Sequence, residues 1–247
     1  MDAIRTATSV GGILPLSSQR TLPGRPFTPG PEAELAAHIH DLAVRLPGVR
    51  KSGVLLIREM PGPFGVVDFS AVLPNPEILL ARLAAGYPPI LSEVDATVVS
   101  VMSGTRHWSI RTIASRLDWS AHIVEGRLHG LRRAGIVARN SAGSWIRHGT
   151  AVPVGRLHIF EMKVRDWRKA INQACTYAAW ADSASVVVNQ LSRTARLFED
   201  SPEWLGFALN EAWLRKPKIL QHSKARRLWA SEHVVAALIG YQPSPAA

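Results

Sequence analysis

The sequence predicts a mixed α/β protein in which a mostly helical segment interrupts a sheet. Two short apolar runs at 53–57 and 65–73 are separated by a Pro-Gly-Pro turn at 61–63, which indicates a β-hairpin. Another apolar run at 157–162 indicates a further strand. Between these strands the chain follows helical rather than strand periodicity, from about 92 to 137. We therefore expect two separated parts of the chain to build one sheet flanked by helices.

The chain is strongly basic, with 29 Lys and Arg residues against 19 Asp and Glu and a net charge of +10 over 247 residues. This balance favours a polyanionic partner, although charge alone fits a merely basic protein about equally well. No apolar run approaches the roughly 18–20 residues that span a bilayer, so we expect no membrane segment. The single cysteine, Cys175, excludes an internal disulfide and is consistent with a reducing cytoplasm, where we expect the protein to be.

Composition and periodicity divide the chain into four parts. A stretch rich in Ser, Pro and Gly at 17–31 closes a flexible leader, and Pro31 then opens a helix with an acidic first turn. We place the leader at 1–30, the first part of an α/β core at 31–90, a helical module at 91–150 and the second part of the core at 151–247. The elements predicted after the strand at 157–162 are a helix at 167–182, a strand at 185–188, a helix at 192–198, a strand at 205–209 and a last helix at 223–239.

The helical module contains three helices followed by a hairpin. Ser92 and Ser120 are candidate N-caps for the first and third helices, and the second begins at Ser109. Two short strand-like runs flank the turn residues 140–143. Over about 60 residues this pattern resembles the winged helix-turn-helix of bacterial transcription regulators. The segment carries eight arginines, no lysine and four acids, which supports double-stranded DNA as the partner over a protein contact.

The winged-helix resemblance implies which side chains contact DNA. In that family the third helix enters the major groove and the wing touches the DNA backbone. Arg127 is the first candidate for a base or phosphate contact, because arginine suits guanine edges. The complete set implied for DNA binding is His122, Glu125, Arg127 and His129 on the third helix, with Arg139 and Arg147 flanking the wing.

Polar residues outside the module form a candidate metal site. Asp68 lies in the second strand of the hairpin, within GVVDFSAV, and Glu161 and Lys163 end the strand within LHIFEMKVR. Strand residues alternate in direction, so Glu161 and Lys163 share a face. Gln173 and Tyr177 lie one turn apart on the next helix. Carboxylates with open coordination positions hold Mg²⁺, whose bound water attacks phosphodiesters, and a lysine neutralises the developing charge.

The order of these elements resembles the PD-(D/E)XK superfamily, the restriction-endonuclease-like fold, with the winged helix as an insertion. The resemblance implies that Asp68 and Glu161 ligate the metal and that Lys163 is the catalytic lysine. Gln173 and Tyr177 match the Gln-x-x-x-Tyr element, which helps to hold the substrate strand in one branch of the superfamily. The chain departs from the pattern in having valine before Asp68 and a long separation from Asp68 to Glu161. Glu34 falls where several members place a first-helix carboxylate that ligates the metal or its water.

We therefore expect a Mg²⁺-dependent DNA endonuclease, with Mn²⁺ as a substitute, whose winged helix selects or holds the duplex. A role in restriction or defence follows only by analogy. The main alternative is a winged-helix transcription regulator with a catalytically silent nuclease-like scaffold, and a third is a nuclease fold that acts through a protein partner. Cutting both strands usually requires two active sites, so a homodimer is an open alternative. The basic run 215–227 fits a solvated face or a phosphate-backbone contact equally well.

Overall fold

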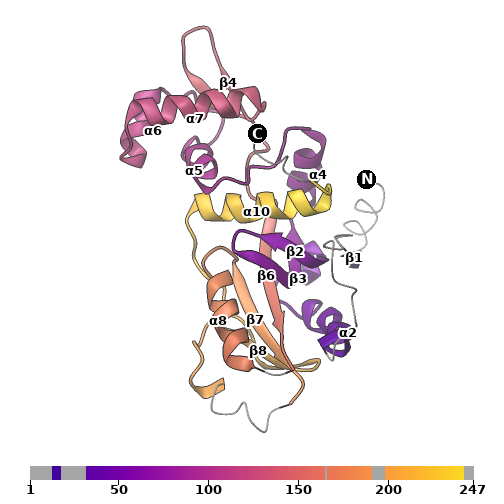
Figure 1. The fold of residues 1–247 in the computed structure, drawn as a ribbon. Coiled ribbons are helices and arrows are strands. Elements are labelled where there is room, and N and C mark those ends of the chain that lie inside the picture. The colour runs from indigo at the N-terminus through magenta and orange to yellow at the C-terminus, as the bar shows by residue number, and fades with distance from the viewer. Residues whose placement is uncertain (1–12, 18–31, 165, 191–197, 242–247) are drawn as a thin grey trace, which may run out of the picture. The chain divides into compact units, whose positions relative to one another are not determined.

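The computed structural model describes residues 13–17, 32–164, 166–190 and 198–241. The chain folds into two compact units, each built from two separated segments (Figure 1). Unit 1 comprises Met1–Pro76 with Gly155–Gln221, and unit 2 comprises Glu77–Val154 with His222–Ala247. The expected interruption of an α/β core by a helical segment is therefore present.

A mixed sheet forms the centre of unit 1, and seven of its strands lie within the described residues. The first two strands in the sheet order are parallel, the next two pairings are antiparallel, the two after those are parallel and the last is antiparallel. The predicted hairpin is confirmed, with Leu55 opposite Val72 in its register. In sheet order the strands are β1 (Ile13–Ser17), β2 (Val54–Gly62), β3 (Gly65–Pro74), β6 (Gly155–Met162), β7 (Ser183–Val188), β8 (Gly206–Leu209) and β9 (Ala212–Arg215).

Helices cover both faces of this sheet, with α2 (Glu32–Ala43) and α8 (Trp167–Tyr177) on opposite sides (Figure 1). The short helix α3 (Val49–Ser52) precedes β2. Successive side chains of β7 lie on opposite faces of the sheet. Val187 packs with the buried residues of α2 on one face, whereas Val186 and Val188 pack with those of α8 on the other. The expectation of a mixed sheet flanked by helices is confirmed at this level.

Unit 2 is mostly helical, and serine side chains begin four of its helices. The oxygens of Ser92, Ser109, Ser120 and Ser223 each accept a hydrogen bond from a backbone N–H in the first turn. The two predicted caps, Ser92 and Ser120, are therefore confirmed. The elements are α4 (Pro76–Ala84), α5 (Glu93–Val101), α6 (Ile110–Leu117), α7 (Ala121–Arg133), the hairpin β4 (Val137–Arg139) and β5 (Trp145–Arg147), and α10 (Lys224–Leu238).

Two buried tryptophans join the helices of unit 2 to its hairpin. Trp108 and Trp145 exchange backbone hydrogen bonds, with N···O distances of 2.7 and 2.8 Å, which adds a one-residue bridge beside β5. Their side chains are almost completely buried in one core with residues of α5, α6 and α7. Leu228 and Trp229 of α10 belong to the same core.

The last helix lies in a different unit from the one that the sequence predicts. We expected 223–239 to belong to the second part of the sheet core, but α10 folds in unit 2. The Trp229 indole N–H donates to the Leu91 carbonyl at 2.9 Å, and Glu232 forms a fully buried ion pair with Arg82 at 2.7 Å. The apolar pattern of the helix shows that one face is buried but does not identify the partner that covers it.

Other predicted elements differ in smaller ways from the structure. The helix expected at 167–182 ends at Tyr177, and the sequence reasoning missed α4 and β9. The expected helix at 192–198 lies almost entirely outside the described residues, as does most of the expected leader, whose residues 13–17 form β1. Among the described helices, none combines the length and the apolar character needed to cross a bilayer.

Candidate functional site

The carboxylate of Asp68 is held against the end of a neighbouring strand. Asp68 lies on β3, which pairs antiparallel with β6 so that Phe69 faces Phe160. Asp68 Oδ2 accepts a hydrogen bond from the Met162 backbone N–H at 2.8 Å. The carboxylate is therefore fixed beside the last residues of β6, and about a third of the side chain is exposed (32%).

Lys163 lies between the two candidate carboxylates. Its Nζ is 3.0 Å from Glu161 Oε1 and 3.8 Å from Asp68 Oδ2, and it also donates to the Met162 carbonyl at 3.0 Å. Glu161 is on β6 and its side chain is 1% exposed, whereas that of Lys163 is 16% exposed. The structure thus brings Asp68, Glu161 and Lys163 together at the end of two adjacent strands.

The Glu161 carboxyl group is strongly perturbed by its surroundings. Burial raises its pKa, and the nearby Asp68 charge raises it further, to about 7. The Lys163 ammonium and the Tyr177 hydroxyl favour the ionised form, but they do not offset burial and the second carboxylate. Two carboxylates lie close together at this partly closed site. A cation bound there would favour the charged forms of both and would lower the pKa of Glu161.

The two helix residues predicted for the site also lie there. The Tyr177 hydroxyl donates to the Val66 carbonyl at 3.5 Å, and burial raises its pKa, as do the charges of Glu161 and Asp68. Gln173 precedes Tyr177 by one turn of α8 and forms a hydrogen bond with it. The Gln173 Oε1 atom is buried and has no hydrogen-bond partner among the described residues. Gln173 and Tyr177 therefore present amide and hydroxyl groups beside the carboxylates.

The oxygen atoms that Asp68 and Glu161 offer are the kind of ligand that a hard divalent cation prefers. Mg²⁺ is typically held by one or two carboxylates, with water and phosphate oxygens completing the coordination. Asp68 and Glu161 supply two, and a metal ion between them would displace the Lys163 ammonium that now neutralises them. Within the described residues, no group of three or more His, Cys, Asp or Glu side chains could hold a metal. Glu34 lies in α2, but its side chain is outside the described residues, so its predicted role stays a prediction.

The candidate DNA-binding residues of α7 differ in their surroundings. His122 is exposed, and His129 forms an i,i+4 pair with Glu125 at 3.8 Å while its ring packs edge-on against Trp145. Arg127 Nη1 is 3.7 Å from the Asp95 carboxylate of α5, although 48% of the side chain is exposed. The first candidate for a base contact therefore already has an intramolecular partner, which the sequence pattern did not reveal.

The two arginines of the hairpin also have intramolecular partners. Arg139 is exposed, its Nε donates to the Gly143 carbonyl at 3.3 Å, and its guanidinium lies 5.4 Å from the Trp145 ring. Arg147 is half-buried and donates to the Ala151 carbonyl at 2.7 Å. Burial lowers the pKa of Arg147. Its hydrogen bond to Ala151 joins the end of the hairpin to the segment that follows, whereas Arg139 keeps an exposed charge.

Sequence reasoning missed further arginines in unit 2. The guanidinium groups of Arg116 and Arg106 lie 4.6 and 5.1 Å from the ring of Trp108. Both side chains are exposed, and stacking on an aromatic ring orients a guanidinium while leaving its edge N–H groups accessible. The only sequence signal for these contacts is that Arg106 precedes Trp108 and Arg116 follows it within the same module.

Comparison with known proteins assigns neither a family nor a function to these residues. No protein-family model, curated protein or solved structure matches the chain.

Proposed function

We propose that the protein is a metal-dependent deoxyribonuclease that holds duplex DNA through unit 2 and hydrolyses it in unit 1. The observation that carries the proposal is the convergence of Asp68, Glu161 and Lys163, with Lys163 Nζ within 4 Å of both carboxylates. Their order, on two paired strands and ahead of the helix that carries Gln173 and Tyr177, supports a restriction-endonuclease-like core.

In the proposed reaction a water oxygen bonds to phosphorus and loses one proton to the solvent, while the bond from phosphorus to the leaving sugar oxygen breaks and that oxygen takes up a proton from the solvent. Asp68 and Glu161 would hold Mg²⁺ or Mn²⁺, which would supply an acidified water and stabilise charge on the phosphate. The Met162 N–H fixes Asp68 for this role. Lys163, released from the carboxylates, carries a proton at Nζ and donates it in a hydrogen bond to the water or a phosphate oxygen.

Two groups beside the carboxylates support positioning of a substrate strand. The Tyr177 hydroxyl stays protonated at neutral pH, because its pKa is raised, and by exchanging its 3.5 Å hydrogen bond to the Val66 carbonyl it can donate to a phosphate oxygen. The amide of Gln173 can donate as well, and its buried Oε1, which has no partner in the described part of the chain, can accept. Hydrogen-bond donors that the fold already holds in place lose little free energy to reorganisation when they bind a charged oxygen.

Unit 2 supports DNA binding through its element order and its charge. Three helices followed by a two-stranded hairpin agree with a winged helix-turn-helix. Arg139 and His122 are exposed on the hairpin and on α7, respectively. We propose that α7 enters the major groove and that Arg139 contacts a phosphate.

The cleavage test compares Lys163→Ala with Lys169→Ala. Lys169 is an exposed lysine in the first turn of α8 and provides a matched control in the same unit. Both proteins and the wild type are incubated with duplex DNA in Mg²⁺, Mn²⁺ or EDTA, and binding is followed in parallel. We expect metal-dependent cutting by wild type and Lys169→Ala only, with unchanged binding by all three. Equal cutting by Lys163→Ala would remove the lysine from the mechanism.

One observation favours the second candidate function, a DNA-binding regulator with a silent core. The Lys163 ammonium pairs with both carboxylates, so one of their two negative charges is offset without a metal. A regulator predicts duplex binding by the wild type, no cutting in either metal, and no effect of Lys163→Ala on binding. The same assay therefore separates the two functions.

A further inference from the structure

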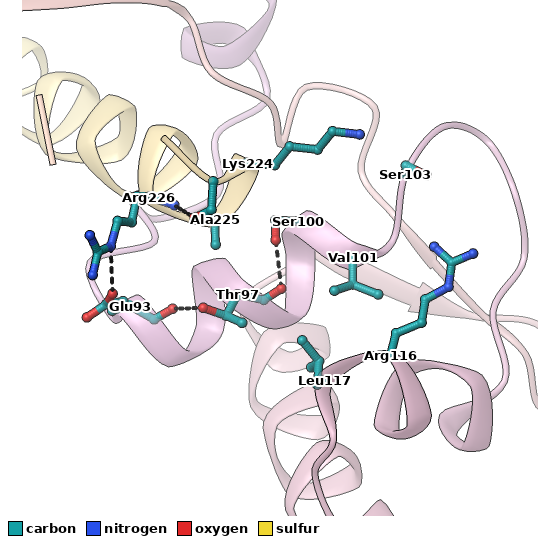
Figure 2. Close-up of a pocket in the computed structure, with 11 residues that line it drawn as sticks. Glu93, Thr97, Ser100, Val101, Ser103, Arg116, Leu117, Lys224, Ala225 and Arg226 are labelled. Atoms are coloured by element: carbon teal, nitrogen blue, oxygen red, sulfur yellow. Dashed lines mark hydrogen bonds and ion pairs between the residues drawn. The ribbon is translucent and has the colours of Figure 1, made fainter. Parts of the chain in front are cut away.

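A concave site in unit 2 is separate from the residues proposed for cleavage and from the exposed side chains of α7. It has a volume of about 590 Å³ and lies between α5, the end of α6 and the start of α10 (Figure 2). This volume is in the range of pockets that bind small molecules. Three basic side chains line it, Arg116, Lys224 and Arg226, against one acid, Glu93.

The charges in this pocket are unevenly compensated. Arg226 Nε lies 3.8 Å from Glu93 Oε1, so these two largely neutralise each other. Arg116 and Lys224 form no ion pair with any of the described residues. In Figure 2 both side chains extend toward the side of the pocket where α5 ends at Val101 and the chain continues through Ser103. The pocket therefore presents two uncompensated cations at one end.

The first turn of α10 adds to this positive potential. The N-terminus of a helix carries a partial positive charge that acidic residues normally offset. The first turn of α10 has no acidic residue and instead contains Lys224 and Arg226. Because Glu93 offsets Arg226, the charge of Lys224 is the one that lies unfavourably near this partial positive charge, and a bound anion would offset both.

The rest of the lining determines what kind of anion fits. The hydroxyls of Thr97 and Ser100 donate to backbone carbonyls of α5, so they can only accept from a ligand. Val101, Leu117 and Ala225 provide apolar surface beside the cations. A ligand with a phosphate at one end and a ring with N–H donors at the other satisfies both parts.

We propose that this pocket binds a nucleoside monophosphate, with Arg116 and Lys224 on the phosphate and the base against Ala225, beside the Thr97 hydroxyl. Arg116 is suited to the task because it stacks on Trp108, which orients its planar donors. A hollow of this volume accommodates one nucleotide, and a duplex is therefore included in the test as the competing ligand. The inference does not rest on cleavage by unit 1.

Calorimetry and thermal unfolding test the proposal with the full chain and 5′-AMP, adenosine, inorganic phosphate and duplex DNA as probes. The variants are Lys224→Ala and Arg116→Ala, with Arg133→Ala as a control that removes one exposed charge of unit 2 outside the pocket. We expect 5′-AMP to bind and raise Tm, more tightly than phosphate, and adenosine not to bind. Each pocket variant weakens the AMP affinity about tenfold, whereas Arg133→Ala leaves it unchanged.

Three results would overturn the proposal. The first is no binding of 5′-AMP at about 10 mM, which corresponds to an affinity too weak to be specific. The second is equal AMP affinity of the wild type and both pocket variants. The third is loss of duplex binding by Lys224→Ala and Arg116→Ala without any AMP binding, which would make the pocket a contact for DNA phosphate.

Discussion

Replacing Glu232 by alanine should destabilise unit 2 more than any surface substitution. Glu232 is fully buried on α10, and its carboxylate accepts hydrogen bonds from Arg82 Nε at 2.9 Å, Arg82 Nη2 at 2.7 Å and the Ile90 N–H at 3.0 Å. Its removal leaves a guanidinium, 2% exposed, whose remaining acceptors among the described residues are the Tyr87 and Pro88 carbonyls.

The magnitude follows from the buried, uncompensated charge. Breaking a buried ion pair by removing one partner costs about 3–5 kcal/mol, a large part of the roughly 5–15 kcal/mol that stabilises a typical protein. For a chain of this size, about 3–5 kcal/mol corresponds to a Tm decrease of roughly 6–20 °C. Glu232→Gln keeps an acceptor and should lose less.

Urea and thermal unfolding of wild type, Glu232→Ala, Arg82→Met and the double variant Arg82→Met with Glu232→Met measure this effect. The double variant should recover much of the loss, because it leaves no buried charge and keeps similar volume. A loss below about 1 kcal/mol for Glu232→Ala would refute the reasoning, since that is the value of an exposed pair.

Two further predictions concern the sheet of unit 1. Burial lowers the pKa of His158 to about 3, below its value of about 6.5 in an unfolded chain, so the unfolded state binds more protons at mildly acidic pH and about 2 kcal/mol of stability is lost from pH 7 to pH 5. His158→Gln should lack this loss, and parallel pH profiles of unfolding free energy for the two proteins would contradict the assignment. In Gly62→Ala the added Cβ would lie 2.7 Å from the Trp180 ring, and this overpacking should cost about 1–3 kcal/mol in urea unfolding. A neutral Gly62→Ala would show that the hairpin can shift away from the ring.

Local features of the fold follow closely from the sequence. The caps at Ser92 and Ser120 and the hairpin around the Pro-Gly-Pro turn depend on residues near each other in the chain, so periodicity and turn chemistry predict them. The Glu-x-Lys spacing predicted that Glu161 and Lys163 share a face, and the 3.0 Å contact agrees with this.

Contacts between residues that are far apart in the chain could not be predicted from the sequence in the same way. The packing of α10 within unit 2 depends on the pair of Arg82 and Glu232, which are 150 residues apart. Likewise, Arg127 faces Asp95 and Arg147 donates to Ala151, so two arginines that the pattern assigned to DNA have partners within the fold. Charge and periodicity show that a side chain is polar or exposed, but only packing decides which group it meets.

The most direct test of the proposed site is cleavage of duplex DNA by Asp68→Asn in Mg²⁺. Asparagine keeps the size of the side chain and an acceptor for the Met162 N–H but removes one of the two charges that would hold the metal. The account predicts metal-dependent cutting by the wild type, a loss of at least about a hundredfold in the variant, and equal duplex binding by both. Cutting by Asp68→Asn at the wild-type rate would contradict the central role of the Asp68, Glu161 and Lys163 cluster.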